Sequence, residues 1–135
     1  MALRLLIVDD NTPFVEAACA LLEREGMDVV GVASTSAAAL RHARELQPDI
    51  TLVDVDLGGE SGLDLVTRLV HVVDDVAGRV VLISADPRTD LRELIDASPA
   101  VGFLPKSQLS GRAIRRLLGD RPGEPGADIN GDRGT

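Results

Sequence analysis

The first 118 residues alternate between short continuous apolar runs and longer segments whose apolar residues recur at helical spacing. A short apolar run bounded by polar or turn residues predicts a buried strand, and helical spacing predicts an amphipathic helix. Five runs predict strands, at residues 3–8, 29–33, 50–54, 80–83 and 101–104. Five segments predict helices, at residues 12–26, 34–47, 63–78, 88–97 and 107–118.

The alternation of strands and helices predicts an α/β fold. Parallel strands joined by helices form right-handed crossovers, which place helices on both faces of one parallel sheet. At the first helix, Thr12 predicts an N-cap and Pro13 the first helical residue. The third strand, residues 50–54, is apolar or β-branched up to Asp54, as is typical of a strand buried on both faces. Ligands of open α/β sheets bind at the carboxyl ends of strands, so Asp54 is expected in the functional crevice.

Composition and charge narrow the class of protein. The chain has 135 residues, which is enough for one domain, and we place that domain at residues 1–118. Residues 119–135 contain five Gly, two Pro and one large apolar residue, so we expect a disordered acidic tail. The formal net charge of −8 argues against a nucleic-acid or anionic-membrane surface. A single cysteine and no apolar stretch of membrane-span length predict a cytoplasmic protein without membrane contact.

Polar residues at the ends of four predicted strands form a candidate site. Asp9 and Asp10 follow the first strand, Asp54 ends the third, and Ser84 and Lys106 follow the fourth and fifth. Clustered carboxylates repel one another unless a cation joins them, and their hard oxygen ligands favour Mg²⁺. A lysine supplies a fixed charge for an anion such as phosphate, and a hydroxyl adds a donor. Together these residues predict a site at which a carboxylate accepts a phosphoryl group.

These residues resemble, in type and in order, those of the receiver domain of bacterial two-component response regulators. The resemblance covers residues 3–118 and rests on four motifs: Asp9-Asp10, Asp54, Ser84-Ala85 and Phe103-Leu104-Pro105-Lys106. It implies a flavodoxin-like, doubly wound, five-stranded parallel sheet of strand order 2-1-3-4-5 with five helices. It also implies a signalling switch rather than an enzyme with turnover.

The resemblance implies an acceptor and a metal site. Asp54 is then the residue that accepts a phosphoryl group from a histidine kinase or a histidine phosphotransfer protein. Mg²⁺ is bound directly by Asp10 and Asp54, with the backbone carbonyl of Asp56 as a third protein ligand and Asp9 acting through water.

The resemblance also implies how the signal leaves the domain. Ser84 and Lys106 are expected to hold the phosphoryl oxygens, and Ser84 and Phe103 to form the switch. We expect the fourth helix, fifth strand and fifth helix to present an output face to a protein partner, with a phosphorylation-dependent homodimer as a further option. Seventeen residues after Leu118 are too few for a DNA-binding module, so we expect a stand-alone receiver without DNA contact.

Some positions depart from the family pattern, and one other function fits the acceptor motif. Gly58 stands where the family usually has proline, so we expect a looser loop. Asp56 and Asp86 are acidic at positions that flank the phosphoryl group, which leaves its lifetime open. Asp54 and Asp56 also resemble the nucleophile and acid of haloacid-dehalogenase-type phosphatases, although those enzymes carry the motif on an early strand. A degenerate receiver that acts only by binding is a third alternative.

Overall fold

The computed structural model describes residues 3–72, 80–86 and 102–119, and within them five parallel strands form one sheet. The order across the sheet is β2-β1-β3-β4-β5, which confirms the predicted topology. The strands are β1 (Arg4–Val8), β2 (Asp28–Ala33), β3 (Ile50–Asp54), β4 (Val80–Ser84) and β5 (Gly102–Pro105).

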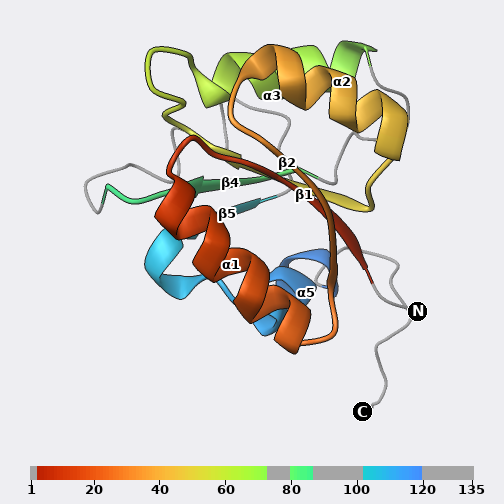
Figure 1. Ribbon diagram of the computed structural model, residues 1–135, viewed down its shortest axis with the longest axis vertical. Helices are drawn as coiled ribbons and strands as arrows, with labels where there is room; N and C mark the ends of the chain where they lie inside the picture. Colours follow the sequence, from red (N-terminus) through yellow and green to blue (C-terminus); the bar gives the residue numbers. More distant parts are fainter. Residues whose placement is uncertain (1–2, 73–79, 87–101, 120–135) are drawn as a thin grey trace.

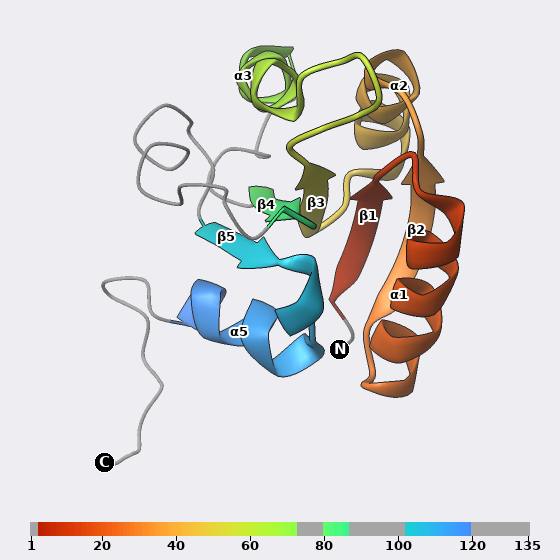
Figure 2. The same cartoon turned by 90° about the vertical axis from the view of Figure 1, so that its left-hand side faces the viewer.

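Helices cover both faces of the sheet. In Figures 1 and 2, two helices lie on one face, α2 (Ser36–Leu46) and α3 (Gly62–Val72). The opposite face carries α1 (Thr12–Arg24) and α5 (Gly111–Gly119). The predicted fourth helix at residues 88–97 and the predicted disordered tail beyond residue 119 lie outside the described residues. No helix in the described ranges is long and apolar enough to cross a membrane.

The core consists of two apolar layers, one on each side of the sheet. Along β3, Ile50 and Leu52 pack in the layer shared with α1 and α5, whereas Val53 packs in the layer shared with α2 and α3. Every residue of β3 and β4 is buried. Burial on both faces explains why these strands read as continuous apolar runs rather than as an alternating pattern.

The structure corrects the start of the first helix. Asn11, not Thr12, is the N-cap of α1, and its side chain accepts a hydrogen bond from the Phe14 N–H at 3.1 Å. Asparagine is preferred over threonine as an N-cap residue, so the helix begins with Asn11 as its cap rather than with Thr12. In α2 the predicted capping by hydroxyls is confirmed, because Thr35 accepts a hydrogen bond from the Ala38 N–H at 3.1 Å.

The last helix begins later than predicted. Lys106–Gln108 form a separate 3₁₀ turn, η1, and α5 begins at Gly111 rather than at residue 107. The break lets Leu109 reach the core, where it is 8% exposed. The Ser110 hydroxyl then accepts a hydrogen bond from the Ala113 N–H at 3.0 Å and caps the first turn. Burial of Leu109 therefore overrides the helical spacing of the sequence.

Candidate functional site

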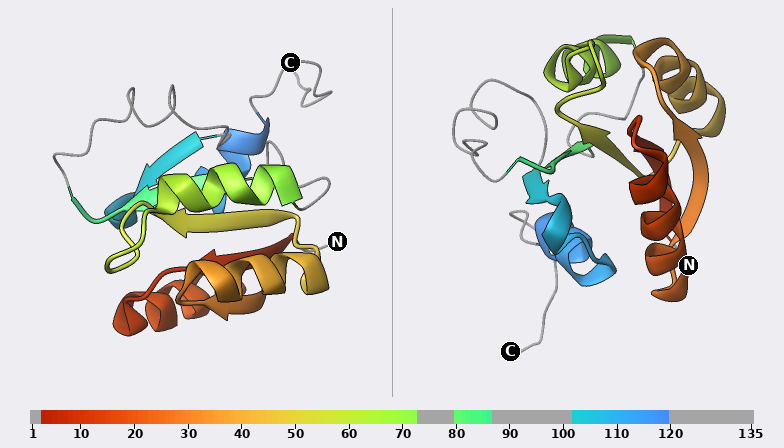
Figure 3. Two further views of the ribbon diagram at one scale, coloured as in Figure 1. Left: turned by 90° about the horizontal axis from the view of Figure 1, so that it is seen from above. Right: turned by 60° about the vertical axis from the view of Figure 1, so that its left-hand side comes forward.

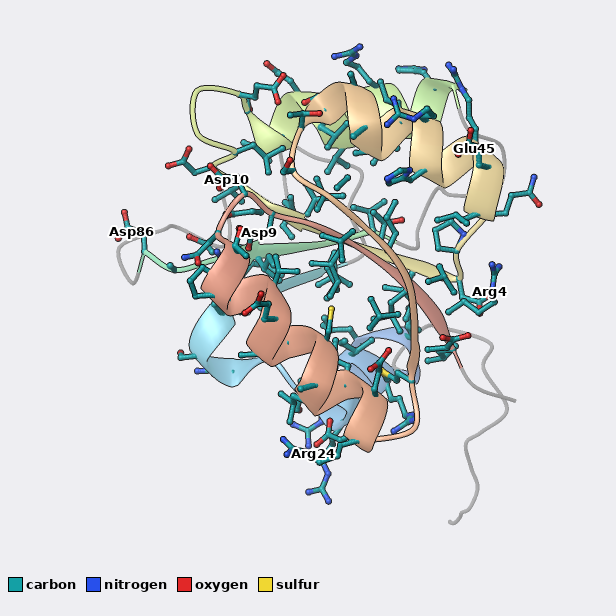
Figure 4. All side chains as sticks on the ribbon, viewed as in Figure 1. Arg4, Asp9, Asp10, Arg24, Glu45 and Asp86 are labelled. Carbon is teal, nitrogen blue, oxygen red and sulfur yellow. The ribbon has the colours of Figure 1, made fainter. Side chains whose placement is uncertain are left out.

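The parallel strands bring their carboxyl ends to one edge of the sheet, where the predicted site residues lie. Figure 3 (left) shows the strand arrows pointing toward the same side of the molecule. In Figure 4, Asp9, Asp10 and Asp86 lie at this end, and Arg4 lies at the opposite end. The edge therefore gathers residues that are distant in the sequence.

Three carboxylates form the centre of the site. Asp9, Asp10 and Asp54 each contribute one oxygen to a group in which all the atoms lie within 4.8 Å of one another. Asp9 and Asp54 are buried, and Asp10 is exposed. The Asp54 Oδ1 atom accepts a hydrogen bond from the Asp56 N–H at 3.1 Å, and the Asp9 Oδ1 atom accepts one from the Asn11 N–H at 2.9 Å. Backbone donors thus orient two of the three carboxylates.

Lys106 binds two of these carboxylates at once. Its Nζ atom lies 2.7 Å from Asp9 Oδ2 and 3.1 Å from Asp54 Oδ2. The same Nζ atom lies 4.4 Å from the centre of the Phe14 ring, which is within the range of a cation–π contact. The turn η1 that follows β5 therefore places an ammonium group between the first and third strand ends.

The environment shifts the pKa values of the acid and of the lysine. Burial raises the pKa of Asp54, and it outweighs the hydrogen bonds from Asp56 and Lys106 that lower this pKa. Burial lowers the pKa of Lys106, but its hydrogen bonds and charge interactions with Asp9 and Asp54 outweigh that effect and raise the pKa. Lys106 is thus held in its charged form, whereas the negative charge of the Asp54 carboxylate is only partly balanced by its neighbours.

The donor set fits a hard divalent cation. Among the described residues, three carboxylates gather here and Lys106 pairs with two of them, so negative charge is in excess at this edge. Apart from its ion pair with Lys106, the buried Asp9 Oδ2 atom has no hydrogen-bond partner among the described residues. Mg²⁺ prefers one or two carboxylates together with water and phosphate oxygens, and Asp9, Asp10 and Asp54 supply the carboxylates of such a ligand set.

The predicted switch residues lie on the neighbouring strands. Ser84 ends β4, one residue beyond Ile83, which is the register partner of Asp54. It is buried, and its hydroxyl accepts a hydrogen bond from the Asp86 N–H at 3.1 Å. Phe103 on β5 is only 7% exposed and packs in the core layer on the side of α2 and α3. Ser84 therefore lies at the functional edge, and Phe103 lies in the core beneath it.

Asp56 takes part in the site through its backbone. Its N–H donates to Asp54, whereas its exposed side chain accepts a hydrogen bond from the Gly58 N–H at 3.1 Å. The carboxylate of Asp56 therefore stabilises the turn that follows β3.

The structure adds two residues that the sequence pattern did not mark as functional. Phe14 reads as an apolar position of the first helix, yet its ring contacts Lys106. Gly62 begins α3 so close to β3 that a Cβ atom would clash with the carbonyl oxygen of Asp54. Gly62 directly precedes the predicted helix at residues 63–78, and the available signal was the glycine itself, since a residue without a side chain often marks a close backbone approach.

Comparison with known proteins agrees with the geometry. The family model of the response regulator receiver domain matches residues 5–117. The nitrate/nitrite response regulator protein NarP of Escherichia coli is 34% identical over 105 residues, which cover 76% of this chain and 47% of NarP. The response regulator GacA of Pseudomonas viridiflava is 30% identical over 105 residues, which cover 77% of this chain and 48% of GacA.

Solved structures give the same result. The receiver domain of the putative response regulator NarL from Mycobacterium tuberculosis superposes with a TM-score of 0.71 at 28% identity, over 87% of this chain and 94% of that chain. The chain spans about half the length of the curated relatives that it matches. The order of its strands, the residues at their ends and the match over residues 5–117 agree, and the chain belongs to the family of response regulator receiver domains.

Proposed function

We propose that Asp54 accepts a phosphoryl group from a phosphohistidine, carried by a histidine kinase or a histidine phosphotransfer protein. Receiver domains act in phosphorylation-dependent two-component signalling, so the family membership supports this role. The observation that carries the proposal is the position of Lys106, which pairs with both Asp9 and Asp54 in a group of three carboxylates. The family assignment also favours a receiver over the phosphatase alternative.

In the proposed reaction, an Asp54 carboxylate oxygen forms a bond to phosphorus while the bond between phosphorus and the histidine nitrogen breaks. The nitrogen leaves with the electron pair and regains a proton. Asp10, Asp54 and the backbone carbonyl of Asp56 would hold Mg²⁺ directly and Asp9 would hold it through water, and the bound ion would supply positive charge to the phosphoryl oxygens. Lys106 already lies beside the Asp54 carboxylate, so its ammonium group needs only a short movement to contact a phosphoryl oxygen.

The output of the switch is proposed to involve Ser84 and Phe103. Ser84 lies at the strand end next to Asp54, and Phe103 lies on the strand beyond it. We propose that the predicted fourth helix at residues 88–97, which lies outside the described residues, forms with β5 and α5 a face that binds a protein partner or a second copy of the chain. The 105 residues matched to a putative transcriptional regulator of Pseudomonas aeruginosa cover only 50% of that protein, so the absence of DNA contact in this protein stays a prediction. The cytoplasmic location also stays a prediction.

Intact mass spectrometry tests the proposed function. The protein is incubated with phosphoramidate and Mg²⁺, and we expect the addition of one phosphoryl group. Asp54→Asn should abolish the addition, whereas Asp28→Asn, at an exposed carboxylate that begins β2, should not. If Asp54→Asn takes up phosphate as the wild type does, the acceptor is misassigned. Steady multiple turnover of a phosphomonoester would favour the phosphatase alternative.

A further inference from the structure

We propose that Gly58 is a positioning residue for Asp10, because the missing side chain at residue 58 leaves room for the Asp10 carboxylate beside Asp9 and Asp54. This inference rests on the proposed role of Asp10 as a ligand of Mg²⁺. Proline, which the family usually has at this position, cannot adopt the φ of +59° that Gly58 has.

The loop that carries Gly58 is anchored on both sides. Leu57 is 3% exposed in the core, and its N–H donates to the Glu60 carbonyl oxygen at 3.0 Å. The Glu60 Oε1 atom accepts a hydrogen bond from the Ser36 N–H at 2.9 Å, which ties the loop to the first turn of α2. The Gly58 N–H itself donates to Asp56 Oδ1. The loop therefore has little freedom to move away from Asp10.

The contact between Gly58 and Asp10 leaves no space for a side chain. A Cβ atom on Gly58 would clash with Asp10 Oδ2 and would lie 3.4 Å from Asp10 Cγ. Because the loop is anchored and Asp10 is exposed, the carboxylate is the part that would yield. Its displacement costs the fold little, but it moves one ligand out of the group of three carboxylates.

Gly59 provides an internal control. It has a φ of +102°, against +59° for Gly58, and a Cβ atom there would meet nothing within 4 Å. The value at Gly58 lies in the left-handed helical region that non-glycine residues occupy occasionally, whereas the value at Gly59 is further from any favoured region. Backbone strain alone would therefore make alanine at least as harmful at residue 59 as at residue 58. Only a positioning role for Gly58 predicts that alanine at residue 58 weakens metal binding more than alanine at residue 59.

Calorimetric titration with Mg²⁺ alone, without a phosphoryl donor, tests the inference in the wild type, Gly58→Ala and Gly59→Ala. We expect the Kd for Mg²⁺ to rise about tenfold or more in Gly58→Ala, as for other residues that orient metal ligands, and to stay near wild type in Gly59→Ala. Equal affinities in the wild type and Gly58→Ala would overturn the inference. An equal or larger loss in Gly59→Ala would also overturn it, because loop strain would then explain the effect.

A crystal structure of metal-free Gly58→Ala separates this inference from the proposed function. If the wild type does not bind Mg²⁺, the proposed metal site is wrong, and the position of Asp10 still decides the role of Gly58. Movement of the Asp10 carboxylate away from Asp9 and Asp54 supports the positioning role. An unmoved Asp10 contradicts it.

Discussion

At the scale of single residues, Asp54 stands out at the carboxyl-terminal edge of the sheet because its surroundings oppose its charge. Burial raises the pKa of Asp54, and the nearby Asp9 carboxylate adds to the shift. Lys106 compensates both acids only in part, since one ammonium group serves two carboxylates. Such uncompensated charge is characteristic of sites that bind a cation or transfer a charged group.

In metal-free buffer, Asp54→Asn is expected to raise the free energy of unfolding at pH 7. The pKa of Asp54 is higher in the folded protein than in the unfolded chain, so wild-type stability decreases as the pH rises through the folded-state value. Asparagine does not ionise, so its advantage should shrink as the pH falls toward about 4. Urea unfolding at several pH values, in the presence of a chelator, measures this difference. Asp28→Asn is the control, and a gain that does not change with pH would contradict the explanation.

Phe14→Leu tests whether the aromatic ring holds Lys106 in position. A cation–π contact contributes about 0.5–2 kcal/mol, so we expect phosphorylation from phosphoramidate to slow by about twofold to thirtyfold. Phe14→Tyr keeps the ring and should restore the rate, whereas the affinity for Mg²⁺ should stay unchanged in both variants. Identical rates for the wild type and Phe14→Leu would show that the ring only fills space.

At the scale of elements, β3 buries one side-chain hydroxyl, that of Thr51, in the apolar core. The side chain of Thr51 is fully buried, and its hydroxyl has no hydrogen-bond partner among the described residues. A buried donor without a partner costs about 1–3 kcal/mol. The strand that positions Asp54 is therefore less stable than its apolar composition suggests.

Thr51→Val is expected to stabilise the protein by about 1 kcal/mol, because valine keeps the β-branched shape and removes the unpaired hydroxyl. Thr35→Val is the matched comparison, since this threonine caps α2 and its loss should destabilise by about 1 kcal/mol. Chemical denaturation of both variants measures the two changes. A destabilised Thr51→Val would show that the hydroxyl has a partner or that valine does not fit.

The elements also show what the sequence could predict. The strands were predictable because burial on both faces leaves a continuous apolar run, as in β3 and β4. Asp54 and Lys106 were predictable as neighbours because parallel strands end at a common edge. The start of α5 was not, since it depends on the burial of Leu109. The contact between Phe14 and Lys106 joins α1 to η1 across the fold, and no local pattern marks it.

At the scale of the whole molecule, the proposed phosphoryl site lies at one end of the sheet, and the proposed output residues lie on β4 and β5. A phosphoryl group adds about two negative charges and three strong acceptors to Asp54. Ser84 lies at the adjacent strand end, and we propose that its hydroxyl turns toward the new acceptors. A free-energy difference of a few kcal/mol between two conformations is enough to change which of them is mainly populated.

Ser84→Ala is expected to leave Asp54 able to accept a phosphoryl group and to weaken the response of the output face. The measurement is the change in amide NMR shifts or hydrogen exchange across residues 88–116 on addition of beryllofluoride with Mg²⁺. We expect large changes in the wild type and smaller ones in the variant, because the hydroxyl that would contact the mimic is missing. If both proteins respond equally, the signal does not pass through Ser84.

The most direct test of the central claim is to locate the phosphoryl group on the chain. After phosphorylation in Mg²⁺, reduction with borohydride converts an aspartyl phosphate to homoserine, which tandem mass spectrometry of the digested protein assigns to one residue. Phosphoryl transfer to the carboxylate that ends β3 predicts homoserine at position 54 and aspartate at positions 9, 10 and 56. Homoserine at any other position, or a phosphorylated protein without homoserine at position 54, would contradict the account.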